Sequence, residues 1–160
     1  MPIDLAHIHL MLNHVPVVGA PLLLLLLTIG FLRRSHELIV VSLALVVGLA
    51  VITGLVFLTG EPAEHLVEHA PWFRDALAET HEAHATVSVL AVVITGVLAG
   101  LALVLRGRPT AALWLPRVAW AGLTLSTLLL GWTAWSGGQI RHEEVRSATV
   151  RRPFIPAAGT

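Results

Sequence analysis

The chain has 160 residues, of which 56% are hydrophobic and only 12% are charged, and its mean hydropathy is +0.81. A soluble domain has roughly 25% charged residues, so the composition excludes an ordinary soluble protein and predicts a membrane protein of one domain. The chain has no Cys, which excludes disulfides, thiolate metal sites and covalent c-type haem attachment, and its formal net charge of zero gives no indication of nucleic-acid binding.

Four apolar segments are long enough to cross a bilayer, which takes roughly 20 residues in a helix. They cover, in chain order, about 15–32, 38–59, 85–105 and 118–135. A helical lead-in from Ile3 is expected before the first segment. Pro16 and Pro21 are expected to kink this segment, where neighbouring helices can satisfy the freed carbonyls. Gly96 and Gly100 form a step of small residues on the third segment, which permits close helix packing.

The connections between these segments differ in charge. Two of them are basic, "RRSHE" at 33–37 and "RGRPTAALWLPR" at 106–117. The connection between the second and third segments is acidic and rich in His. We expect two short surface helices in it, the second leading into the third apolar segment, because Pro62 and Pro71 each suit the first turn of a helix.

The basic connections predict the orientation of the chain. Under the positive-inside rule they face the cytoplasm, which puts both termini and the acidic connection outside. We therefore expect a multi-pass protein of the bacterial inner membrane. Residues 1–146 would form an all-α transmembrane four-helix bundle, and residues 147–160 a C-terminal tail.

The histidines are unevenly distributed over this topology. Eight of the nine fall on the outer, periplasmic side of the membrane. A single interfacial His is more often solvated than ligating, but several segments here deliver imidazoles to one end of a bundle. This clustering favours ligation of a cofactor or a metal ion. The eight are His7, His9, His14, His65, His69, His81, His84 and His142.

Haem b is the first cofactor that the pattern predicts. His14 and His84 each directly precede a long apolar run, so we expect them at a similar depth. Two facing imidazoles at one depth could ligate a haem iron from both sides. We therefore expect His14 and either His81 or His84 as axial ligands. His142 or His9 would close the site or ligate a second cofactor.

A transition-metal ion is the alternative cofactor, because imidazole suits Cu, Zn and Fe alike. Glu82, next to His81, could orient that ligand through its other ring nitrogen. His65 and His69, at i and i+4 on an expected surface helix, are a weaker candidate pair because the rest of a catalytic motif is missing. The expected metal ligands are His7, His9, His14, His81, Glu82 and His142.

Four short motifs also carry a resemblance to a known family: "LNHVP", "TGEPAE", "HE" at 81–82 and "GGQIRH". Together, from about His9 to His142, they resemble a family of small four-helix bacterial membrane proteins known as a domain of unknown function. Some relatives in that family are fused to Rieske-type iron–sulfur domains, so the resemblance implies electron transfer. The family has no established catalytic residues to carry over, and His84 lies outside the motifs.

These observations predict a b-type cytochrome-like electron carrier rather than a stand-alone enzyme. Besides the lipid bilayer, its expected partners are quinol or a periplasmic redox protein. Two alternatives stay open: a His-rich metal-binding membrane protein, and a structural subunit of a larger respiratory or photosynthetic complex. A homo-oligomer is compatible with each of them.

Overall fold

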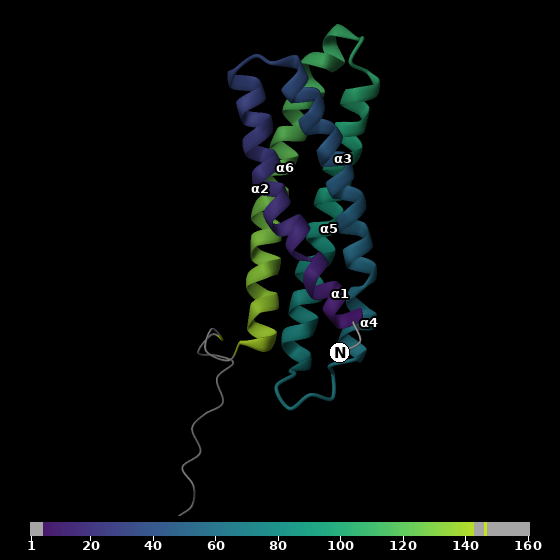
Figure 1. Ribbon diagram of the computed structural model, residues 1–160, viewed down its shortest axis with the longest axis vertical. Coiled ribbons are helices and arrows are strands. Elements are labelled where there is room, and N and C mark those ends of the chain that lie inside the picture. The colour runs from purple at the N-terminus through teal and green to yellow at the C-terminus, as the bar shows by residue number, and fades with distance from the viewer. Residues whose placement is uncertain (1–4, 143–145, 147–160) are drawn as a thin grey trace, which may run out of the picture.

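The protein is a bundle of long antiparallel helices that lie side by side along one axis (Figure 1). The computed structural model describes residues 5–142 and residue 146. Within these residues there is no strand, and the helices are α1 (Leu5–Leu12), α2 (His14–Leu32), α3 (His36–Leu58), α4 (Gly60–His65), α5 (Asp75–Val104) and α6 (Pro109–Arg141). The expected tail, residues 147–160, lies outside the described residues.

Four helical stretches of this part of the chain are long and apolar enough to cross a membrane. This confirms the expected all-α membrane bundle. The turns at 33–35 and 105–108 lie at one end, which we call the basic end. The connection at 59–74 and the last residues of α6 lie at the other, which we call the histidine end. The four stretches are Ala6–Leu32, His36–His65, Asp75–Val104 and Pro109–Arg141.

The first of these stretches is broken at Asn13, between α1 and α2. Pro16 has no amide hydrogen, so it cannot donate to the carbonyl of Leu12 four residues earlier. The expected irregularity next to His14 is therefore confirmed. The Asn13 amide still donates to the carbonyl of His9 over 2.9 Å, which keeps the chain coiled through the break. In Figure 1, α1 leaves the line of α2 and crosses toward α4.

The connection between α3 and α5 contains one short helix, α4, rather than the two expected. Residues 66–74 form turns and extended segments, and α5 begins at Asp75, four residues after Pro71. The second expected helix, which leads into the third span, is therefore the first turns of the long helix α5 and not a distinct element. This membrane-spanning helix carries His81 and His84.

Large apolar side chains cover the outside of the bundle, while small side chains fill the inside. Leu22, Leu55 and Leu128 are exposed on three different helices, as expected where the solvent is lipid. Small interior residues allow helix backbones to approach one another closely. The buried alanines of the core are Ala20, Ala50, Ala99, Ala102 and Ala119.

α5 makes its closest contacts with α3 on one side and α6 on the other. A Cβ atom on Gly96 would lie 2.4 Å from Cβ of Ala50, and one on Gly122 would lie 2.6 Å from Oγ1 of Thr95. Real Cβ atoms do not come so close, so only glycine fits at either position. The predicted close packing is confirmed at Gly96, whereas a Cβ on Gly100 would have an ordinary contact of 3.8 Å.

Buried hydroxyl groups link α5 to α6. Oγ of Ser88 lies 2.7 Å from Oγ1 of Thr133, and Oγ1 of Thr95 lies 3.3 Å from Oγ of Ser126. Other buried hydroxyls on α3 donate to the carbonyl four residues earlier in their own helix. Such bonds satisfy polar groups that would be costly to leave unpaired in an apolar interior.

Arg146 connects the end of α6 to the segment that precedes α5. Its guanidinium donates to the carbonyls of Gln139 and Ile140, both over 3.0 Å, and to the carbonyl of Trp72 over 3.1 Å. Arg141 lies over the Trp72 ring, 4.8 Å from its centroid. The last carbonyls of α6 are thereby capped, and the connection before α5 is tied to α6.

The turn at the basic end contains a left-handed residue, Arg34, with φ of 52°. The amide of Arg34 donates to the carbonyl of Phe31 over 3.1 Å. The amide of Ser35 donates to the carbonyl of Gly30 over 3.0 Å. The Ser35 hydroxyl then caps α3 by accepting from the amide of Leu38 over 3.3 Å. A side chain in the left-handed region costs about 1 kcal/mol, so glycine would suit the backbone at position 34 better.

The contact between α3 and α5 can be tested with Gly96→Ala. The added methyl group has no room against Ala50, and overpacking of this kind costs about 1–3 kcal/mol. We expect a lower midpoint of thermal unfolding, followed by circular dichroism in detergent. Gly48→Ala is the matched control, because a Cβ there meets nothing within 4 Å. Equal midpoints for the two variants would contradict the close approach.

Candidate functional site

The inward face of α1 carries His9. His9 and Asn13 are half-buried and Pro16 is buried, whereas His7 and His14 lie on the exposed face. The side of α1 that carries His9 is therefore the one that packs into the bundle.

His9 is held by a hydroxyl at the junction of α3 and α4. Its Nδ1 lies 2.9 Å from Oγ1 of Thr59, and that hydroxyl donates its proton to the carbonyl of Val56 over 2.7 Å. A hydroxyl has one proton, so Nδ1 of His9 must be the donor to Thr59. In the neutral ring, the lone pair that can act as a ligand is then on Nε2.

His81 is held in the same way, by α6. Its Nδ1 lies 3.1 Å from the carbonyl oxygen of Thr133 and 3.4 Å from Oγ of Ser136. A carbonyl only accepts, so Nδ1 carries the proton and the neutral ring has its lone pair on Nε2. Gly137 makes this approach possible, because a Cβ there would lie 2.9 Å from Cε1 of His81.

His84 is the least satisfied imidazole at this end. Its Nδ1 is buried and has no hydrogen-bond partner among the described residues. The ring packs on Trp132 of α6, with centroids 4.6 Å apart and planes tilted by 39°. A buried polar atom without a partner is uncommon in proteins and calls for an explanation, such as a group that the chain binds.

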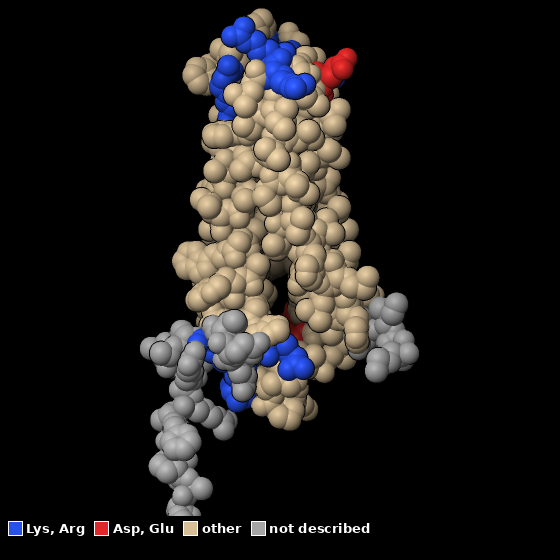
Figure 2. Space-filling model, turned by 60° about the vertical axis from the view of Figure 1, so that its left-hand side comes forward, with Lys and Arg blue, Asp and Glu red and all other residues tan. Residues whose placement is uncertain are grey.

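Three imidazoles at the histidine end are turned into the bundle, and His81 is within electrostatic range of both His9 and His84. The three come from α1 and α5, and α6 supplies the carbonyl, hydroxyl and indole that hold two of them. In Figure 2 the surface is hollowed between helices in the lower half of the molecule, at the level of the histidine end. We call His9, His81 and His84 the imidazole cluster.

His14, the ligand first expected, does not belong to this cluster. Its side chain is exposed, and its Nδ1 lies 2.7 Å from the carbonyl oxygen of Leu10 in the preceding turn. His84 is directed between α5 and α6, against Trp132. The facing pair of His14 and His84 expected from their equal depth is therefore not formed. α2 turns His14 outward.

The other predicted ligands are also outside the cluster. His7 and His142 are exposed, and His142 ends α6, with its amide donating to the carbonyl of Gly138 over 3.0 Å. Glu82 is exposed and within electrostatic range of Glu64. The orienting role expected of Glu82 belongs instead to the carbonyl of Thr133, because adjacent residues of a helix point in different directions.

The histidine pair at positions 65 and 69 does not share a helix face. α4 ends at His65, so His69 lies in the following turns. Both rings are exposed and neighbour Glu68, with Nδ1 of His65 3.2 Å and Nδ1 of His69 3.7 Å from its carboxylate oxygens. Both rings are therefore solvent-exposed neighbours of one carboxylate.

A ready-made site for a bare metal ion is not seen in the described part of the chain. No three of its His, Asp and Glu side chains are grouped so that they could hold one ion. The set predicted for a metal is thus spread over the histidine end, with His7, His14, Glu82 and His142 exposed and His9 and His81 turned inward.

No family model, no curated protein and no solved structure matches the chain. The resemblance to a family of small four-helix membrane proteins therefore stays a prediction. The case for a function rests on the residues of this chain alone.

Three residues of the site were missed by the sequence reasoning: Thr59, Thr133 and Trp132. Thr59 begins the quoted motif "TGEPAE" but was given no role, and Trp132 and Thr133 lie within an apolar span. Each comes from a different helix than the imidazole it contacts. The one available signal was the glycine pair at 137–138, since adjacent glycines late in a span favour close approach of another group.

The position of the His81 ring against α6 can be tested with Gly137→Ala. The new methyl group would displace the ring from the carbonyl of Thr133, so we expect the side-chain nitrogen signals of His81 to shift in NMR spectra of ¹⁵N-histidine-labelled protein. Gly138→Ala is the matched control, since a Cβ there meets nothing within 4 Å. Unchanged His81 signals in Gly137→Ala would show that the ring is not seated against α6.

Proposed function

We propose that the protein is a membrane electron carrier that binds haem b without a covalent bond, through His9 and His81 of the imidazole cluster. The observation that supports this most directly is the way both rings are held. Each is fixed through Nδ1, to Thr59 or to Thr133, and so offers Nε2 as the ligand atom. Metal-ligating histidines are held in this manner in proteins generally.

The number of available imidazoles favours haem over a bare ion. A structural or catalytic Zn²⁺ takes three or four protein ligands, and the described residues offer no such group of three. A porphyrin supplies four nitrogens of its own, so one or two imidazoles suffice to hold its iron. Haem ligated by histidine carries one electron at a time by changing the oxidation state of its iron.

The surrounding residues have defined roles in this proposal. The oxygens of Thr59 and Thr133 fix the ring orientations and make each Nε2 a better ligand. Nδ1 of His84 would gain a partner from a polar substituent of the bound group, which accounts for its burial without one among the described residues. Electron partners would be quinol, from the bilayer, or a periplasmic redox protein.

Haem binding can be tested by absorbance after haem-supplemented expression and purification in detergent. We expect an intense Soret band in the wild-type protein, and a severalfold lower haem content in His9→Ala and in His81→Ala. His14→Ala is the matched control, because its ring is exposed and bonded to the carbonyl of Leu10, one turn earlier in α1. The double variant with Ala at 65 and 69 should likewise keep its haem.

The outcomes separate the competing functions. Colourless wild-type protein that carries a stoichiometric Cu, Zn or Fe ion would favour the metal-binding alternative. Colourless protein without metal would favour a structural subunit of a larger complex. Equal haem in His81→Ala and His14→Ala would overturn the ligand assignment even if haem is bound.

We also propose that both termini and the imidazole cluster lie on the periplasmic side of a bacterial inner membrane. The arginines of the two tight turns support this, because short basic connections stay in the cytoplasm. Figure 2 shows them gathered at the upper end, beyond a long stretch of surface without charge. They are Arg33, Arg34, Arg106, Arg108 and, on the first turns of α6, Arg117.

Orientation can be tested with single cysteines, because the chain has none of its own. His36→Cys and His69→Cys both replace exposed residues, at the basic end and the histidine end respectively. In intact cells, a membrane-impermeant maleimide should label the cysteine at 69 and not that at 36. Labelling of both would contradict the four-span topology, and labelling of 36 alone would reverse the orientation.

A further inference from the structure

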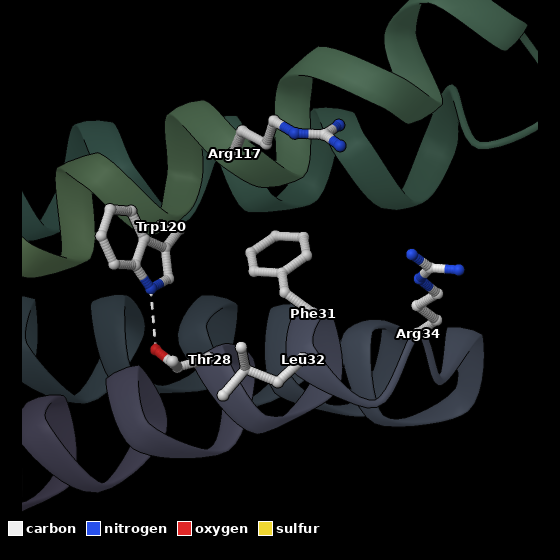
Figure 3. A pocket seen from close by; sticks show the side chains of 6 residues that line it. All are labelled: Thr28, Phe31, Leu32, Arg34, Arg117 and Trp120. Atoms are coloured by element: carbon white, nitrogen blue, oxygen red, sulfur yellow. Dashed lines mark hydrogen bonds between the residues drawn. The ribbon is translucent and has the colours of Figure 1, made fainter.

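A pocket of about 400 Å³ lies at the basic end, between α2 and α6 (Figure 3). Its position is at the opposite end of the bundle from the imidazole cluster, so it has no part in the proposed haem site. The pocket is lined by Thr28, Phe31, Leu32, Arg34, Arg117 and Trp120.

The lining is divided into a charged rim and an apolar wall. In Figure 3, Arg34 and Arg117 come from opposite sides of the pocket and both lie toward the end of the bundle, beyond the ring of Phe31. On the other side of that ring, Nε1 of Trp120 donates to Oγ1 of Thr28 over 2.8 Å. The indole nitrogen and the hydroxyl are thus paired with each other, so the deeper part of the pocket presents mainly apolar surface.

The residues that line this pocket carry positive charge and no negative charge. A second pocket of about 300 Å³ shares Phe31, Arg34 and Arg117 with the first and adds Arg106 and His36. Neither pocket is lined by Asp or Glu. An anion that reaches the rim would meet the guanidinium of Arg34 and that of Arg117, one nitrogen of which already donates to the carbonyl of Leu113 in its own helix. The planar donors of a guanidinium group match phosphate oxygens.

We propose that this pocket binds an anionic phospholipid, with its phosphate between Arg34 and Arg117 and an acyl chain along Leu32 and Phe31. The rim lies where the spans end, which is the depth of lipid headgroups. Leu32 has 79% of its surface exposed on the lipid side of α2, so the apolar wall is open to the bilayer. Basic pockets between spanning helices bind such headgroups in other membrane proteins.

The backbone at Arg34 supports this proposal independently of the charges. Its φ of 52° is unfavourable for any residue with a side chain, and glycine would fit the turn without strain. Arginine at this position places a guanidinium on the rim at the expense of backbone stability. Strained residues of this kind gather where a protein binds a ligand.

The test is a lipid titration of the detergent-solubilised full chain, followed by native mass spectrometry. Phosphatidylglycerol should bind in a 1:1 complex more tightly than phosphatidylcholine with identical acyl chains. The double variant Arg34→Gln with Arg117→Gln should weaken phosphatidylglycerol binding by about tenfold or more. The matched control is Arg33→Gln with Arg108→Gln, which removes the same charge at the same end from residues that line neither pocket. It should change binding by no more than about twofold, since charges at a distance are screened.

Arg34→Gly separates binding from folding. Because glycine relieves the left-handed backbone, this variant should unfold at the same or a higher temperature than wild type and still bind phosphatidylglycerol more weakly. Equal loss of binding in the two double variants, or equal affinity for the two lipids, would overturn the proposal. Inorganic phosphate binding as tightly as phosphatidylglycerol would also overturn it, because the acyl chains would then contribute nothing.

Discussion

The contacts of α5 with its two neighbours hold the bundle together. Thr95 and Gly96 are adjacent on this helix. Thr95 packs against Gly122 of α6, and Gly96 packs against Ala50 of α3. In lipid there is little hydrophobic drive between helices, so association depends on such close packing and on buried hydroxyls. The same helix carries two of the three clustered imidazoles. Their position relative to α6 therefore follows from a contact made several turns away.

Hydropathy predicted the bundle because an apolar run of sufficient length has no other stable arrangement in a bilayer. The break between α1 and α2 was predicted from Pro16, because it depends only on the missing amide hydrogen of that residue. The start of α5 was not predicted, because it depends on tertiary contacts. Pro71 suits a helix start, yet the helix begins at Asp75, and Leu77 and Ala78 in its first turn are buried against the bundle. That burial favours one continuous helix over a separate surface segment.

The sequence identified the end of the bundle at which imidazoles gather, but not which of them face one another. In a soluble helix the apolar face marks the inside, whereas here lipid makes both faces apolar and the rotation of α1 and α2 is hidden. His14 was therefore preferred to His9 on its place at the start of the apolar run, and only the packing shows that His9 faces the bundle. Their partners could not be read locally either, because Thr59 and Thr133 lie on other helices.

The imidazole cluster contains residues of the first and third spans, so its parts are synthesised at different times. His9 leaves the ribosome while α5 has yet to be synthesised, and its partner Thr59 follows at the end of the second span. His81 arrives later still, and the Thr133 carbonyl that orients it belongs to the last span. The cluster is therefore complete only after the whole bundle has entered the bilayer. A group that needs the complete cluster for binding can therefore enter only after the last span is in place, from the membrane or from the compartment that the histidine end faces.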